Sequence, residues 1–226
     1  MSELIVPDLF LGVKRGVFRQ DDPHAPKSTK DFEKIRASVL KRDDYTCQFC
    51  GFKSNKFQEV HHVDDNHKNN DPSNLITACP LCHQVYHIWF AGKHKMGTIV
   101  RIPELSQIEL NNLTRILWIA QMSSDIHIKK YAELLENNIR LTGQSSAKEY
   151  LDTFDPCIVG EILQQLSPKE YLARTVQMKG FHLMPLKQGF TKHIQYWLDN
   201  VFDENNPEDW LTKTEEWYNE YNKKPN

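Results

Sequence analysis

CQFCG at residues 47–51 and CPLCHQVYH at residues 79–87 each begin with two cysteines that are separated by two residues. Two thiolates on one tight turn, followed by a glycine that accepts a left-handed backbone, form a zinc knuckle. The 28 residues between the pairs leave room for a hairpin, which is the spacing of a treble clef. The alternative is two unrelated redox or core pairs. We expect one structural zinc ion with all positions filled, bound by Cys47, Cys50, Cys79 and Cys82.

The composition is that of a soluble globular protein. The chain has 226 residues, 39% of them hydrophobic and 26% charged, which is enough to bury a core. Its net charge of -2 creates no overall field that attracts nucleic acid. No apolar run approaches the roughly 20 residues that span a bilayer. Because residues 1–11 contain Glu3 and Asp8 and lack both a basic start and a small-residue cleavage site, they do not resemble a signal peptide. We expect a cytoplasmic protein without membrane insertion, whose paired cysteines favour metal over disulfides.

Residue patterns divide the chain into three parts. Residues 1–27 form an N-terminal β-rich segment, for which a hairpin or paired strands are predicted around residues 3–19. Residues 28–103 contain both cysteine pairs and begin with a helix that ends near Arg42. Residues 104–226 are predicted to be entirely helical. The expected fold class is α+β, mainly α, with a treble-clef (ββα-metal) zinc module followed by a helical lobe.

Capping boxes mark two helix starts in the helical lobe, at Ser106–Glu109 and at Ser167–Glu170. Cys157 lies in an apolar helical context, where a small buried side chain is expected. The other helices of this lobe are predicted at about residues 128–141, 148–154 and 158–166, and from Asn206 on.

Histidines gather near the second cysteine pair. His83 and His87 are four residues apart, which places them on one helical face about 6 Å from each other. His61 and His62 lie in an alternating, strand-like run, and Asn74 follows a polar loop. Each of these residues also has a structural explanation, as a partly buried strand residue, a helix cap or a surface group.

The order Cys-x-x-Cys, His-His, Asn-Leu, Cys-x-x-Cys-His-x-x-x-His resembles the HNH family of nucleases over about Arg42–Phe90. The resemblance implies that a second, catalytic divalent metal binds His61, His83 and His87. It further implies that His62 is the general base that activates water, and that Asn74 holds the loop that orients His62. A metal-dependent HNH endonuclease acting on DNA or RNA is therefore one functional hypothesis.

Local charge does not favour a nucleic-acid partner. Residues 27–56 carry eight basic and four acidic residues, but the loop near the histidines has three aspartates against one lysine. Phosphate neutralisation supplies most non-specific affinity for nucleic acid. We therefore expect nuclease activity to be weak or absent.

A longer pattern resembles the DotN (IcmJ) family, subunits of the Dot/Icm type IVB secretion coupling complex. It comprises RDDYTCQFCG at residues 42–51, PELSQIELNNL at residues 103–113 and the stretch from Leu183 to Trp197. The resemblance implies a virulence-related protein-transport adapter at the cytoplasmic face of the bacterial inner membrane. It would bind the C-terminal tail of the coupling ATPase DotL and other coupling-complex subunits, and support effector recruitment and export.

Aromatic residues could supply a groove for a partner helix, although each one taken singly is better explained by the protein's own core. The candidates are Trp89, Phe90, Trp118, Trp197, Trp210 and Trp217.

Overall fold

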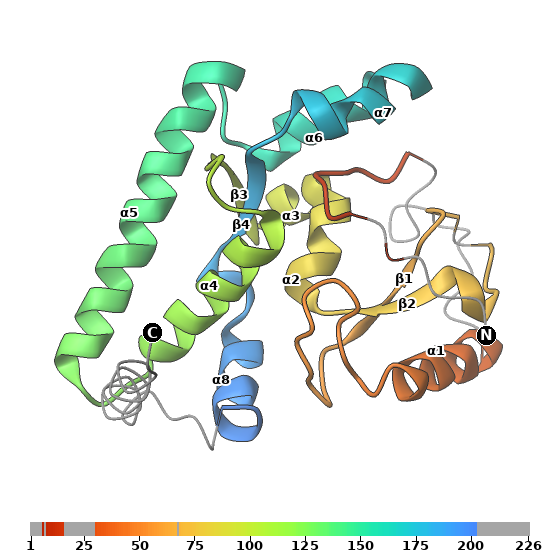
Figure 1. The fold of residues 1–226 in the computed structure, drawn as a ribbon, viewed down its shortest axis with the longest axis horizontal. Helices are drawn as coiled ribbons and strands as arrows, with labels where there is room; N and C mark the ends of the chain where they lie inside the picture. The colour runs from red at the N-terminus through yellow and green to blue at the C-terminus, as the bar shows by residue number, and fades with distance from the viewer. Residues whose placement is uncertain (1–5, 7, 16–29, 67, 203–226) are drawn as a thin grey trace, which may run out of the picture.

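The computed structural model describes residues 6, 8–15, 30–66 and 68–202. Helices dominate, and two small sheets lie among them (Figure 1). The predicted α+β, mainly α class is confirmed. The first elements are α1 (Lys30–Arg42), β1 (Glu59–His62), the 3₁₀ helix η1 (Pro72–Asn74), β2 (Leu75–Ala78), α2 (Pro80–His83), η2 (Gln84–His87) and α3 (Ile88–Lys93). The remaining elements are β3 (Gly97–Arg101), α4 (Gln107–Ala120), α5 (Ile126–Leu151), α6 (Pro156–Gln165), α7 (Pro168–Gln177), β4 (Phe181–Pro185), η3 (Lys187–Gly189) and α8 (Thr191–Asn200).

Strands β1 and β2 form the predicted hairpin between the cysteine pairs. They are antiparallel, with Glu59 opposite Ala78 and His62 opposite Leu75. All four residues of β2 are buried, and Pro80 starts α2 directly after it, where a helix tolerates a missing N–H. The resulting strand, strand, helix order is that of a ββα-metal module, which we call the ββα module.

A second antiparallel sheet pairs β3 with β4, with Ile99 opposite Leu183. The prediction that residues 104–226 are entirely helical is therefore wrong at Phe181–Pro185. The segment is too short for a helix, and Gly180, at φ +85°, turns the chain into it. Because the sheet joins strands from both sides of the predicted boundary at residue 103, the two regions share one core. Figure 1 shows this sheet between α5 and the ββα module.

One long helix, α5, replaces the two helices predicted at residues 128–141 and 148–154. The sequence Thr-Gly-Gln-Ser-Ser at residues 142–146 is typical of a loop, yet the helix continues through it. Gly143 packs against β3, where an added Cβ would lie 2.7 Å from the Cβ of Val100. The glycine therefore permits a close approach between helix and sheet. The capping boxes that start α4 and α7 are both confirmed.

The described part of the N-terminal segment, residues 6 and 8–15, contains no strand, in contrast to the predicted hairpin. It is fastened to helices. The N–H of Gly12 donates to the carbonyl of Val85, and the N–H of Ile88 donates to the carbonyl of Gly12. The buried apolar side chains of this segment lie at every second position and are Leu9, Leu11 and Val13.

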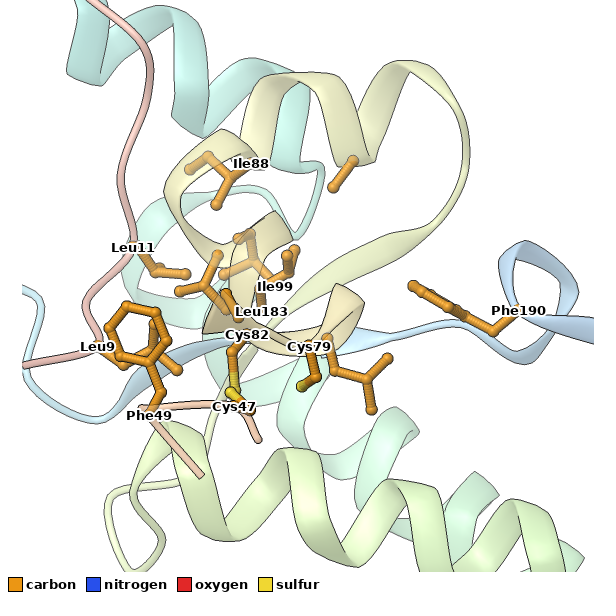
Figure 2. Packing of buried hydrophobic residues seen from close by; sticks show 14 of the residues in the cluster. Leu9, Leu11, Cys47, Phe49, Cys79, Cys82, Ile88, Ile99, Leu183 and Phe190 are labelled. Carbon is orange, nitrogen blue, oxygen red and sulfur yellow. The ribbon is translucent and has the colours of Figure 1, made fainter. Parts of the chain in front are cut away.

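The main hydrophobic core contains apolar side chains from most helices and strands, and it includes Cys47, Cys79 and Cys82. Figure 2 shows Cys47 and Cys82 close together within it. Trp118 and Trp197 are fully buried there, so they do not line a surface groove. Cys157 is only partly buried. Trp210, Trp217 and the helix predicted after Asn206 lie outside the described residues. No helix in the part of the chain described here is long and apolar enough to cross a bilayer.

Candidate metal centre

Four thiols meet between the knuckle turn and the start of α2, and we call them the cysteine centre: Cys47, Cys50, Cys79 and Cys82. Their sulfur atoms all lie within 4.8 Å of one another. The Sγ atoms of Cys50 and Cys79 are 3.7 Å apart. A tetrahedral zinc ion with Zn–S bonds of about 2.3 Å separates its sulfur ligands by about 3.8 Å. The cysteine centre therefore has the donor set and the size that fit a metal ion such as zinc.

Local backbone geometry brings the sulfurs together. Gly51 adopts φ +73°, which closes the knuckle turn, and its N–H donates to the carbonyl of Cys47. The N–H of Gln48 donates to the carbonyl of Thr77, which docks the turn on β2. Cys79 has an extended backbone and forms the N-cap of α2. Each cysteine pair is thus set by its own turn or helix start, and β2 holds the two pairs in register.

Two side chains of α4 reach the sulfurs. Arg115 Nη2 lies 3.3 Å from the Sγ of Cys79 and 3.9 Å from that of Cys50. Asn111 Nδ2 donates to the Sγ of Cys82 at 3.4 Å. Sequence reasoning missed both residues. The sequence carried no signal for them, because only the structure shows that four polar residues of α4 are buried: Gln107, Asn111, Thr114 and Arg115.

The four thiols have divergent acidities in the protein. Hydrogen bonds from the other three thiols, and then the charge of Arg115, lower the pKa of Cys50. Burial raises the pKa of Cys79 well above its usual value. Hydrogen bonding to the neighbouring thiols raises the pKa of Cys82. Four clustered thiols do not all ionise by themselves, whereas a bound divalent cation holds each of its cysteine ligands as a thiolate.

Three histidines form a second group, the histidine cluster, contributed by β1, α2 and η2: His61, His83 and His87. Their nearest ring nitrogens all lie within 4.8 Å of one another. The ring centroids of His83 and His87 are 4.8 Å apart, and those of His61 and His83 are 5.5 Å apart. The chain passes from α-helix to 3₁₀ helix between His83 and His87, and the four-residue spacing still puts them side by side. These three imidazoles could hold a second metal ion.

Glu59 contacts this cluster. Its Oε2 is paired with the Nδ1 of His83. Burial disfavours the protonated form of His83, but the Glu59 carboxylate outweighs burial, so the pKa of His83 is raised. Burial also disfavours the Glu59 carboxylate, yet the charge of His83 lowers the pKa of Glu59. Carboxylates in this position orient metal-binding imidazoles in many proteins, and they also form plain ion pairs with imidazolium.

His62 lies on the other face of β1 from His61, because successive strand residues alternate. Its Nε2 is 3.0 Å from the Oδ1 of Asn70, and its ring stacks on Phe32 at a centroid distance of 6.0 Å. Among the described residues, the converging group does not include His62. Asn74 accepts a hydrogen bond from the N–H of Asp64 and donates to its carboxylate, so it ties the loop that carries Asn70.

Two arginines near the ββα module, Arg36 and Arg42, donate hydrogen bonds to its own backbone. Arg36 donates to the carbonyl of Gln58. Arg42 donates to the carbonyls of Pro72 and Leu75. These guanidinium groups are therefore already bonded within the protein, which leaves less basic surface for a phosphate backbone.

Two sequence comparisons show which known proteins this chain resembles. Residues 47–87 match the HNH endonuclease family, which covers the cysteine centre and the histidine cluster. Over 183 residues the chain is 31% identical to the type 4 apparatus protein DotN of Legionella pneumophila, covering 80% of this chain and 85% of that protein. The chain belongs to the DotN family. In this DotN-family protein the HNH match is only one part, since the likeness to the Legionella protein continues far beyond 41 residues into the surrounding helices.

Proposed function

We propose that this protein is a component of a type IV secretion apparatus, in which a zinc-stabilised HNH fold serves as the scaffold of an adapter. The observation that carries the proposal is the likeness to the Legionella DotN protein over 80% of the chain. A fold supports many unrelated functions, so a match to nuclease architecture over residues 47–87 weighs less than a likeness over most of the chain.

The partner that we propose is the C-terminal tail of the coupling ATPase DotL, together with other subunits of the coupling complex. The protein would act in the bacterial cytoplasm, held at the inner membrane through these partners, and would support effector recruitment, export and virulence. Exposed apolar side chains at helical spacing support a docking role. On α7 they are Leu172 and Val176, which are 70% and 77% exposed. On α5 they include Tyr131, Leu134 and Leu135.

Co-purification tests this function directly. The zinc-loaded full chain should retain the DotL tail at micromolar concentration, with most of the affinity in a few apolar anchors worth about 2 kcal/mol or more each. Leu172→Asp tests the face on α7, with Gln177→Asp as the control on the same helix. Leu134→Asp tests the face on α5, with Asn137→Asp as its control, because Asn137 is exposed on the same helix but lies to the side of the apolar face. A tail that does not bind the folded, zinc-loaded wild type would remove the adapter proposal.

The histidine cluster favours a second candidate, a metal-dependent HNH endonuclease. Three imidazoles that converge as the HNH pattern implies are the observation in its support. The bonded guanidinium groups of Arg36 and Arg42 weigh against it. Anomalous scattering from a crystal separates the two candidates. The adapter proposal expects one ion at the cysteine centre and does not need one at the histidine cluster.

A further inference from the structure

Helix α4 lies outside the segment that matches the HNH family, yet two of its side chains donate to the sulfurs of the cysteine centre. We propose that Arg115 and Asn111 are positioning residues of the metal centre. Their hydrogen bonds hold the metal-bound thiolates and offset their charge, so tight metal binding depends on a helix that follows the ββα module. This inference rests on the proposal that the four cysteines bind zinc.

Charge is the first argument. Arg115 is only 3% exposed, and a buried guanidinium group needs an anionic partner. None of the ion pairs between described residues involves Arg115. Its contacts are the Oδ1 of Asn112, the rings of Phe52 and Trp197, and the sulfurs of Cys79 and Cys50. A zinc ion with four thiolates carries a net charge of about -2. That charge supplies the anion that this arginine otherwise lacks.

The orientation of Asn111 is the second argument. Gln107 accepts from the N–H of Leu183 and donates to the Leu183 carbonyl, which fixes the Gln107 amide on β4. The same amide nitrogen donates to the Oδ1 of Asn111 at 3.0 Å. The oxygen of Asn111 is thereby engaged, and its NH₂ group is directed at the Sγ of Cys82. A continuous chain of hydrogen bonds leads from β4 to the cysteine centre.

Such contacts affect how a metal is held. A hydrogen bond donated to a thiolate withdraws electron density from the sulfur and fixes its direction. Loss of an outer partner of this kind typically weakens metal affinity by about 10- to 100-fold. Arg115 also packs against the protein, because its guanidinium lies 3.8 Å from the centroid of the Phe52 ring. Variants must therefore separate packing from hydrogen bonding.

The experiment measures zinc affinity by competition with a chromogenic chelator on the full-length protein. Arg115→Met keeps an apolar stem and removes the donors, Arg115→Lys keeps the charge without the planar fork, and Asn111→Leu removes the second donor. Thr114→Val is the matched control, because Thr114 is equally buried on α4 and its side chain makes no hydrogen bond in the structure. We expect affinity to fall by about 10- to 100-fold in Arg115→Met and Asn111→Leu. Arg115→Lys should show a smaller loss and Thr114→Val none.

Cobalt substitution supplies a readout that packing alone does not move. Removing a donor from a thiolate raises the energy of its lone pair, so the sulfur-to-cobalt absorption should shift to longer wavelength in Arg115→Met and in Asn111→Leu. Unchanged affinity and spectrum in a folded Asn111→Leu protein would overturn the proposal for Asn111, and the same result in Arg115→Met would overturn it for Arg115. An equal loss in Thr114→Val would reduce the effect to general packing. A wild type that binds no metal at the cysteines would overturn the proposal, because the proposal assumes that these cysteines bind zinc. The adapter proposal would then be tested separately, by binding of the DotL tail.

Discussion

Gly160 lies at a close approach between α6 and α3, and replacing it with alanine should destabilise the whole protein. A Cβ at this position would lie 2.8 Å from the Cβ, 3.1 Å from the Cα and 3.2 Å from the backbone nitrogen of Trp89. Because these atoms belong to or adjoin a helix backbone, the two helices must move apart. Overpacking of this kind costs about 1–3 kcal/mol. Because the backbone of Trp89 cannot move aside as a side chain can, we expect a cost of about 3 kcal/mol here. Alanine recovers about 1 kcal/mol through helix propensity, so a net loss of about 2 kcal/mol is expected.

Thermal unfolding of the zinc-loaded protein measures this loss. For a chain of this size, about 2 kcal/mol corresponds to a decrease in Tm of roughly 4–8 °C. Gln164→Ala is the matched control, because Gln164 is exposed on the same helix and differs little from alanine in propensity. A Gly160→Ala protein as stable as the wild type would show that α3 and α6 are not closely packed, and would refute the reasoning.

Three further predictions concern the metal, the chemistry and acid stability. Cys82→Ala should prevent folding, because structural zinc contributes on the order of 10 kcal/mol; less than one zinc per chain in a folded, chelator-resistant wild type would contradict this. Plasmid DNA with Mg²⁺, Mn²⁺, Ni²⁺ or Zn²⁺ should be cut weakly or not at all by the wild type. Cleavage that His62→Ala loses by about 10²–10⁴-fold would instead establish the nuclease. Burial lowers the pKa of His182, so the unfolded chain binds its proton more readily. The stability due to neutral His182 is present above about pH 6.5 and is lost as the pH falls through the lowered pKa. His182→Gln should therefore lose less stability than the wild type between pH 7.5 and 5 in chemical unfolding, and equal losses would refute the assignment.

Features that depend on a few neighbouring residues were predictable from the sequence. Two Cys-x-x-Cys turns indicated the cysteine centre, and the four-residue spacing indicated that His83 lies beside His87. A serine with a glutamate three residues later indicated where α4 and α7 begin. Each of these signals is local, because the partners of the interaction lie within one turn of the chain.

Features that depend on distant segments were not predictable. Leu183 pairs with Ile99 of β3, and Gly143 packs against Val100, so in both cases the partner is distant in the sequence. Arg115 had no local mark of its role, since its sulfur partners come from residues that precede it by 36 and 65 positions. For His62, the HNH pattern implied a catalytic role but did not show that its ring would stack on Phe32.

The attachment of the N-terminal segment to α7 determines when the protein can finish folding during its synthesis. Tyr171 bonds the backbone of Val13, and Arg174 bonds the carbonyl of Leu11, across separations of 158 and 163 residues. A ribosome that adds about 5–20 residues per second needs roughly 10–30 s to reach them. During that interval α7 is absent, and the segment has the backbone hydrogen bonds of Gly12 with Val85 and Ile88 but not those with α7. Leu11 and Val13 are therefore less protected from a chaperone or a neighbouring nascent chain.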